Sequence, residues 1–344
     1  MVGNILSVAL WVAATDFRTF LASRVVGGLS EGNVQLANAI ATDISDESHR
    51  GSTMALVGAC FSIAFTCGPA LGAALSNITT VAANPFATSA GVSLLLIVLE
   101  TAYLYFYLPE THPRLTKLRH ETNANPPASK NENNKQQKQE DDVTQRKPEQ
   151  KHEHTNNPAL LNALHFLFLL PFSGLEFSLP FVTATFYANT STKASPSALN
   201  GRLLSMMGLI ASLLQGTVVR RLPPLITLRV GVVACTISFF LLASVNSLAG
   251  LYAAGGLLAI TTATVVTSLN SLGSFEAREG ERGVVLGRLR SWGQAGRAAG
   301  PLLFCSLFWF AGREIAYTTG GFAMVVVCVG VFTTLKAPVI AARK

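Results

Sequence analysis

The stretch "RGSTMALVGACFSIAFTCGPALGAAL", residues 50–75, decides the fold class of this protein. It is long and apolar enough to span a bilayer, which requires about 20 mostly apolar residues. Pro69 cannot donate a hydrogen bond to the carbonyl of Phe65, so the Gly68-Pro69 pair predicts a bend in this helix. Small residues recur at every fourth position and predict a seam for close packing of another helix: Cys60, Ala64, Gly68 and Gly72.

The same pattern recurs in "RGVVLGRLRSWGQAGRAAGPLLFCSL", residues 282–307. Each copy is a Glu-x-x-Arg-Gly sequence followed by an apolar run that contains Gly-Pro. Duplicated halves are typical of transporters, so we expect both helices at the boundary between two halves that rock. A packing kink in any helical membrane protein is the alternative. The matching pairs are Glu47/Glu279, Arg50/Arg282, Gly51/Gly283, Gly68/Gly300, Pro69/Pro301, Leu71/Leu303 and Leu75/Leu307.

The composition indicates a membrane protein. Of the 344 residues, 49% are hydrophobic and 13% are charged, whereas soluble domains carry roughly 25% charged residues. The segment from Glu110 to Glu153 holds 17 of the 45 charged residues, so the rest of the chain is poorer still in charge. The formal charge of +7 does not indicate nucleic-acid binding, because the basic residues fall in predicted loops and form no continuous face.

The sequence offers no motif for catalysis or metal binding. It has no nucleophile–base pairing, no Gly-rich phosphate loop and no metal-ligand spacing, so we expect neither an enzyme nor a bound cofactor. All five cysteines lie in apolar runs without a CxxC pair, which favours buried side chains over disulfides. They are Cys60, Cys67, Cys235, Cys305 and Cys328.

Hydropathy predicts an all-α polytopic membrane protein with about ten segments. Nine are full spans: 17–42, 51–76, 86–108, 158–187, 199–219, 224–245, 248–270, 283–311 and 315–337. Residues 1–14 are apolar but too short to cross a bilayer alone, so we interpret them as the end of a further span.

A polar, low-complexity segment, 109–157, divides the chain and predicts a disordered linker, because it has too little apolar surface to bury. Residues 1–108 would then form the remnant of one helical bundle, and residues 158–338 would form a second bundle of six helices. Residues 339–344 remain as a short tail.

The positively charged residues set the expected orientation, since cytosolic loops carry an excess of Lys and Arg. This rule places the linker and the tail in the cytosol, together with the loops around Arg220 and Arg282. The loop 43–51 is net acidic and is the one exception. Two glycosylation sequons, at Asn77 and Asn189, fall on the opposite side. Which membrane holds the protein is left open.

Charged residues inside the predicted spans mark the candidate site, because each costs about 2.5–3.5 kcal/mol at a span centre. In the span 17–42, several residues fall within about 40° of one helical face and predict a polar stripe that faces a cavity: Arg24, Gly28, Glu31, Gln35 and Asn38. Glu176 lies between Pro171 and Pro180, which predicts a discontinuous helix around a binding site near the bilayer midplane.

Further candidates for a substrate or proton pathway are Arg297, Glu100, Thr261 and Thr264. Arg297 is the deepest arginine of the late spans, one turn before Gly300-Pro301. Glu100 is equally consistent with a proton site and with a structural ion pair. The residues expected to be interfacial or structural are Arg288, Arg290 and His165.

Five stretches together resemble the major facilitator superfamily, and within it the drug transporters typified by tetracycline efflux proteins. They are "FLASRVVGGLSEGNVQLANAIATDIS" (20–45), "GSTMALVGACFSIAFTCGPALGAAL" (51–75), "LPET" (108–111), "FSGLEFSLPF" (172–181) and "RGVVLGRLRSWGQAGRAAGPLL" (282–303). The resemblance implies twelve helices in two six-helix bundles that expose a substrate alternately to either side. It also implies that residues 1–14 end helix three, and that helices one and two are missing from this chain.

The resemblance assigns roles to particular residues. Arg24 matches the family's helix-four arginine and Gly28 its glycine, whereas Gly27 stands where a glutamine is usual. The antiporter motif, with a gating role, falls on Gly68, Pro69 and Gly72, with alanine at positions 64 and 73 where the family has glycine. The corresponding gating residues of the second copy are Gly296, Gly300 and Pro301.

These observations predict a secondary active transporter, monomeric in the bilayer, that exports small amphipathic drugs or organic anions by proton-coupled antiport. Glu176 or Glu31 would titrate, and Arg24 and Arg297 would attract negative charge. The alternative is a membrane scaffold or receptor of the same fold that does not transport, or an inactive truncated product.

Overall fold

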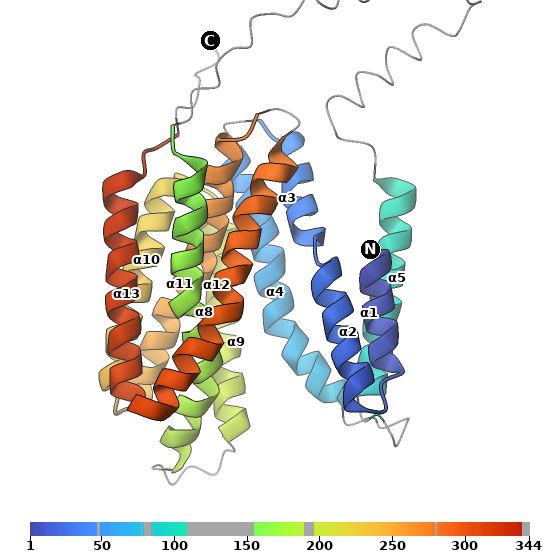
Figure 1. Ribbon diagram of the computed structural model, residues 1–344, viewed down its shortest axis with the longest axis horizontal. Coiled ribbons are helices and arrows are strands. Elements are labelled where there is room, and N and C mark those ends of the chain that lie inside the picture. Colours follow the sequence, from blue (N-terminus) through green and yellow to red (C-terminus); the bar gives the residue numbers. More distant parts are fainter. Residues whose placement is uncertain are drawn as a thin grey trace, which may run out of the picture.

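The computed structural model describes residues 1–46, 49–76, 78, 84, 86–108, 155–188, 196–278 and 281–338. These residues form helices and no strand (Figure 1). The helices are α1 (Val2–Val12), α2 (Phe17–Ser30), α3 (Asn33–Asp43), α4 (Arg50–Ser76), α5 (Ala87–Tyr107), α8 (Pro158–Ala188), α9 (Pro196–Leu214), the π-helix η1 (Gln215–Val219), α10 (Pro224–Ser244), α11 (Leu248–Phe275), α12 (Arg282–Ala311) and α13 (Arg313–Thr334).

Several predictions concern residues outside this set. The linker from 109 to 154, the tail from 339 to 344, the sequons at Asn77 and Asn189, and the paired Glu47 and Glu279 all lie outside the described residues.

Seven of the described helices are long and apolar enough to cross a membrane, which makes the protein a multi-pass membrane protein. They are α4, α5, α8, α9 with η1, α10, α11 and α13. Each coincides with a predicted span to within a few residues, because the length and hydropathy of a span are local properties of the sequence. The two aligned copies of the repeat begin their helices at equivalent positions, Arg50 and Arg282.

The prediction of one continuous helix over residues 17–42 is wrong. α2 ends at Ser30 and α3 begins at Asn33, with Glu31 and Gly32 between them in non-helical conformations. Glycine is a poor residue for a helix interior and a common one at a helix start, which is the place that Gly32 takes at α3. The five residues of the predicted polar stripe are therefore divided between two helices and the break, and they do not share one helical face.

The predicted discontinuity around Glu176 is also wrong, since α8 runs without interruption through Pro171 and Pro180. A proline removes one backbone hydrogen bond, and neighbouring helices can compensate for that loss. Here α12 packs along α8 so closely that a Cβ atom added to Gly296 would lie 2.6 Å from the carbonyl oxygen of Phe166. The two helices are therefore in direct backbone contact on this face.

The helices form two halves (Figure 1). α8 to α13 build a compact bundle whose core includes Leu175, Phe239, Leu258 and Tyr317. α1, α2 and α5 form a separate group, while α4 packs against α9 and α11, and α3 packs against α12. The duplicated helices α4 and α12 thus each reach the opposite half, which confirms the expected boundary position.

The segments predicted to share the linker side do meet at one end of the molecule. Asn156, just before α8, donates from Nδ2 to Oε1 of Glu276 at 3.1 Å and accepts from the backbone N–H of Lys336 at 2.8 Å. At the start of α4, Ser52 accepts a hydrogen bond from Arg220 at 2.8 Å. We call this end of the molecule the linker end. That it faces the cytosol stays a prediction.

Candidate functional site

Three arginines of α12 form ion pairs with acids on three other elements, and we call this set the arginine ladder. The pairs are Arg282 Nη1 with Asp43 Oδ1 at 3.0 Å, Arg290 Nη2 with Glu31 Oε1 at 3.0 Å, and Arg297 Nη2 with Glu176 Oε2 at 2.8 Å. Asp43 ends α3, Glu31 lies in the break between α2 and α3, and Glu176 belongs to α8.

The spacing of the three arginines places them on one side of α12. At 100° per residue, positions 282, 290 and 297 fall within an arc of about 80° on α12. At 1.5 Å per residue, the three are separated along the helix axis by about 12 Å and 10 Å. The ladder therefore follows one side of α12, from the linker end toward the middle of the molecule.

The first two pairs connect the halves at the linker end. Arg282 also donates from Nη1 to the backbone carbonyl of Thr42 at 2.9 Å, and both members of the Arg282–Asp43 pair are largely buried. The Arg290–Glu31 pair is more exposed, chiefly at the carboxylate. Sequence reasoning missed Asp43, because nothing in an acidic loop indicates that its partner lies more than 200 residues away.

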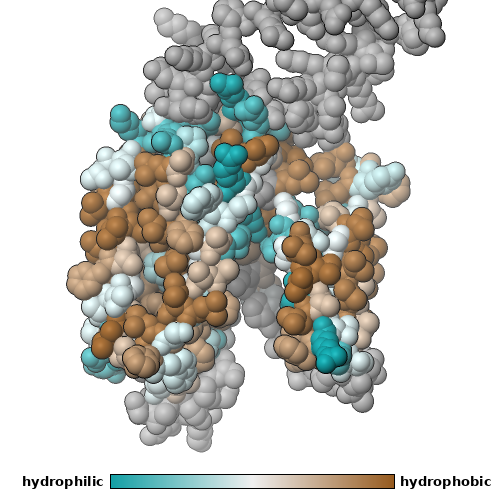
Figure 2. Space-filling view, in the orientation of Figure 1, coloured by the Kyte–Doolittle hydropathy of each residue, from teal (hydrophilic) through white to brown (hydrophobic). Residues whose placement is uncertain are grey.

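The third pair lies beyond the closed end. Arg297 and Glu176 both belong to the second half, and their side chains keep 41% and 23% of their surface exposed. Since Arg297 lies on the same side of α12 as Arg290, it faces the space between the halves. Figure 2 shows the surface hollowed there, with hydrophilic residues on its wall, and we call this hollow the cleft. A charged pair that is partly exposed to the cleft can exchange partners with an ion or a proton.

Arg24 lies on α2 without an acidic partner among the described residues. Its guanidinium carbon is 4.8 Å from the ring centroid of Trp11 and 5.5 Å from that of Phe20, which are cation–π distances. The sequence predicted that Arg24 needs a partner but did not reveal Trp11. Of the other predicted stripe residues, Asn38 is buried in α3, and the side chain of Gln35 lies outside the described set.

The small-residue seam predicted on α4 is on the wrong face. Cys60 and Ala64 are exposed, and a Cβ atom added to Gly68 would meet nothing within 4 Å. The contacting face is instead formed by Gly58, Ser62 and Thr66. Two residues of offset rotate the face by about 200°, which periodicity alone could not resolve. Figure 1 shows α4 as a curved helix, and the bend at Gly68-Pro69 stays a prediction because the side chains of Pro69 and Gly72 are outside the described set.

Gln215, at the start of η1, is the main contact of this face and was missed by the sequence reasoning. Its Oε1 accepts from Ser62 Oγ at 2.6 Å, and its Nε2 donates to the carbonyl oxygen of Ala263 at 3.2 Å. A Cβ atom on Gly58 would lie 2.6 Å from Nε2. π-Helical turns are often found at functional sites, and a glutamine in the apolar run "ASLLQGTVV" was the available signal.

The glycines of the second repeat pack inside one half. Added Cβ atoms would collide with the backbone of α8, at Phe166 for Gly296 and at Leu170 for Gly300. They therefore stabilise the α8–α12 contact and do not line the boundary between the halves, contrary to the expected gating position. Pro301 follows within the uninterrupted α12.

Three other predicted site residues, Thr261, Thr264 and Glu100, take no part in the arginine ladder. Thr261 donates to the carbonyl oxygen of Gly231 at 3.2 Å, and a Cβ atom on Gly231 would collide with Thr264, so both threonines serve the α10–α11 contact. Glu100 is exposed on α5 and has no ion pair among the described residues. His165 is buried and donates from Nδ1 to the carbonyl oxygen of Leu289 at 2.9 Å, in keeping with the structural role predicted for it.

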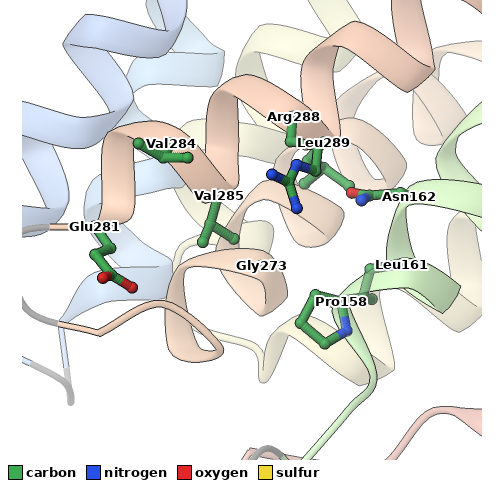
Figure 3. Close-up of a pocket in the computed structure, with 9 residues that line it drawn as sticks. All are labelled: Pro158, Leu161, Asn162, Gly273, Glu281, Val284, Val285, Arg288 and Leu289. Carbon is green, nitrogen blue, oxygen red and sulfur yellow. The ribbon is translucent and has the colours of Figure 1, made fainter.

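A separate pocket of about 320 Å³ opens at the linker end between α8, α11 and α12. Figure 3 shows Arg288 and Asn162 close to each other on its wall, with Glu281 at a distance and Val284 and Val285 between. Arg288 is two residues from Arg290, so it lies on nearly the opposite side of α12 and outside the ladder. The pocket belongs to the second half alone.

Comparisons with known proteins agree with this architecture. Residues 1–301 match the family described as Major Facilitator Superfamily. The chain is 31% identical over 321 residues to major facilitator superfamily domain-containing protein 10 of Mus musculus, covering 92% of this chain and 67% of that protein. The Homo sapiens protein of the same name is 30% identical over 322 residues, covering 93% of this chain and 68% of the relative.

Solved structures give the same result. The human organic anion transporter MFSD10 (TETRAN) has a TM-score of 0.72 and 29% identity, over 96% of this chain and 75% of that one. The transporter FucP in its outward conformation has a TM-score of 0.62 at 13% identity, over 97% and 83% of the two chains, and supports the fold alone. The chain therefore belongs to the major facilitator superfamily of membrane transporters and resembles its domain-containing protein 10.

Proposed function

We propose that this chain moves small organic anions or amphipathic drugs across a membrane by alternating access, in exchange for protons. The observation that carries the proposal is the arginine ladder. Two of its pairs hold the halves together at the linker end, and the third stands in the cleft. Charged residues within a membrane protein are costly and commonly mark an ion or substrate pathway.

The ladder supplies a gate. In the conformation described here, Arg282–Asp43 and Arg290–Glu31 close the linker end, while the cleft opens toward the opposite end (Figure 2). Opening at the linker end requires both pairs to separate as the halves rotate. An ion or substrate that binds the two conformations differently shifts their populations, which is the condition for coupled transport.

Arg297 supplies the attraction for an anion. Its guanidinium is paired with Glu176, so an anionic substrate and the carboxylate compete for the same donor. Protonation of Glu176 would remove its charge and free Arg297, which couples proton and anion binding at one place. Arg24 over Trp11 offers a second cation beside an aromatic surface, which suits an amphipathic molecule.

The substrate class also draws on a relative. The human structure at 29% identity is that of an organic anion transporter, and the arginines Arg297 and Arg24 are compatible with the same class of substrate here. Fold and family alone do not determine a substrate, so the proposal depends on the residues of the cleft.

Reconstitution of the chain into liposomes with an imposed pH gradient tests this function. We expect uptake of a fluorescent organic anion that follows the gradient, and we expect Glu176→Gln or Glu31→Gln to abolish the dependence on pH. Glu314→Gln is the matched control, because Glu314 is exposed at the start of α13 and lies outside the ladder. Flux that is untouched by both ladder substitutions would mean that the proton sites are wrong. Thermal stabilisation by the anion without flux would favour the receptor alternative.

A further inference from the structure

A further concave surface lies on the outer side of the second half, away from the cleft and from the pocket at the linker end. It is a groove of about 500 Å³ that runs along α10. It is lined by Ile226, Val230, Val233 and Ile237 of α10, by residues of α11 and by Phe332 of α13. The residues of α10 recur at intervals of three and four, so they form one continuous apolar stripe.

The groove faces lipid. α10 is one of the helices long and apolar enough to span the membrane, and Ile226, Val230 and Ile237 keep 48%, 49% and 50% of their surface exposed. Figure 1 shows α10 and α13 on the side of the molecule farthest from α1 and α5. In a bilayer, such a surface meets acyl chains.

One charged residue interrupts this apolar surface. Arg229 lines the groove, and its guanidinium carbon lies 5.0 Å from the ring centroid of Phe332. Its Nε atom is buried without a hydrogen-bond partner, and within the described ranges the side chain pairs with no acid. A cation inside a span is unfavourable unless it meets an anion or reaches the interface.

The dimensions of the groove fit one leaflet. From Ile226 to Ile237 the stripe is about 16 Å long, roughly half of a hydrocarbon core of about 30 Å. Arg229 lies near the linker end of the groove, about 7 Å from the first residue of α10. A headgroup beside Arg229 would therefore leave its acyl chain along the remaining stripe.

We propose that this groove binds an anionic phospholipid, with its phosphate on Arg229 and one acyl chain along α10. The apolar stripe supplies the affinity for the chain, and the unpaired arginine supplies the preference for negative charge. The predicted orientation places the headgroup at the cytosolic leaflet, which is rich in anionic lipids.

Native mass spectrometry of the detergent-purified chain tests the proposal with phosphatidylglycerol and phosphatidylcholine of identical acyl chains. We expect phosphatidylglycerol to bind roughly fivefold more tightly, as one arginine near a headgroup implies. Arg229→Gln should remove this preference. Val233→Trp should fill the groove and weaken the binding of both lipids. Arg202→Gln, which removes an exposed arginine of α9, should change neither.

Two results would overturn the lipid site. One is an unchanged preference for phosphatidylglycerol in Arg229→Gln. The other is displacement of the lipid by millimolar inorganic phosphate together with normal lipid binding by Val233→Trp, which would indicate a site for free phosphate instead.

Discussion

At the scale of single residues, Arg297 and Glu176 show how the chain keeps charge within a membrane. Each residue alone would leave an uncompensated ion between α8 and α12, and the pair at 2.8 Å compensates both. The exposure of the two side chains to the cleft weakens the pair relative to a buried one, because solvent screens it. Under the proposed function, this weak pair is the one that an anionic substrate separates.

Replacement of Arg297 by alanine should lower the free energy of unfolding by about 1–3 kcal/mol, less than the 3–5 kcal/mol lost when a fully buried pair is broken. Denaturation in mixed micelles measures this change. The double variant with Glu176→Ala should recover part of the loss, since no charge is then left alone. Arg288→Ala serves as the control, because Arg288 lies on the opposite side of α12. If the double variant lost as much free energy of unfolding as the two single variants together, the pairing would be contradicted.

At the scale of elements, the contact between α8 and α12 depends on glycine. α12 lies so close to α8 that a Cβ atom on Gly300 would collide with the carbonyl oxygen of Leu170 and with Ser173. Its repeat partner on α4, Gly68, has nothing within 4 Å of the same position. The two copies of one motif are thus used differently, and a matched pair of substitutions can separate their roles.

Gly300→Ala should destabilise the protein by about 1–3 kcal/mol, because added volume in a packed contact forces the helices apart. Gly68→Ala should be neutral or should stabilise by up to about 1 kcal/mol, through the higher helix propensity of alanine. Thermal unfolding of the two variants in detergent measures the difference. Equal effects would mean that the α8–α12 contact is not as close as described.

The contact of α4 with η1 depends on a buried polar group. Gln215→Leu should lower the free energy of unfolding by about 1–3 kcal/mol, because Ser62 is then buried without its acceptor. Adding Ser62→Ala should cost less than the sum of the two single changes, since the hydroxyl no longer needs a partner. Strict additivity in unfolding experiments would argue against the hydrogen bond.

At the scale of the whole molecule, the two halves meet at the linker end and separate toward the other (Figure 1). α4 against α9 and α11, and α12 against α3, form the crossing contacts. A covalent bond between α3 and α12 should therefore hold the molecule in the conformation described here and prevent the exchange between conformations that transport requires.

Ala39 and Gly283 offer the position for this bond. A Cβ atom on Gly283 would lie 3.9 Å from that of Ala39, within the range of about 3.5–4.5 Å found in disulfides. In a background without the five native cysteines, Ala39→Cys with Gly283→Cys should form a disulfide on mild oxidation and stop flux, and reduction should restore it. Each single cysteine is a control. Full flux with the disulfide formed would show that the linker end does not open during transport.

The sequence by itself determined the helical membrane class, the limits of most spans and the duplication that starts α4 and α12 at Arg50 and Arg282. These features follow from local composition, because about 20 apolar residues suffice to define a span wherever it packs. It also identified Glu31, Glu176 and Arg297 as costly charges that need partners.

Only the tertiary structure decided which partners they have, which face of α4 is covered, and whether a helix breaks at Gly32 or continues through Pro171. Each of these outcomes depends on contacts between residues far apart in the chain. Periodicity fixes the angles between side chains on one helix. Which face of that helix is buried depends on a neighbouring helix, and periodicity does not identify it.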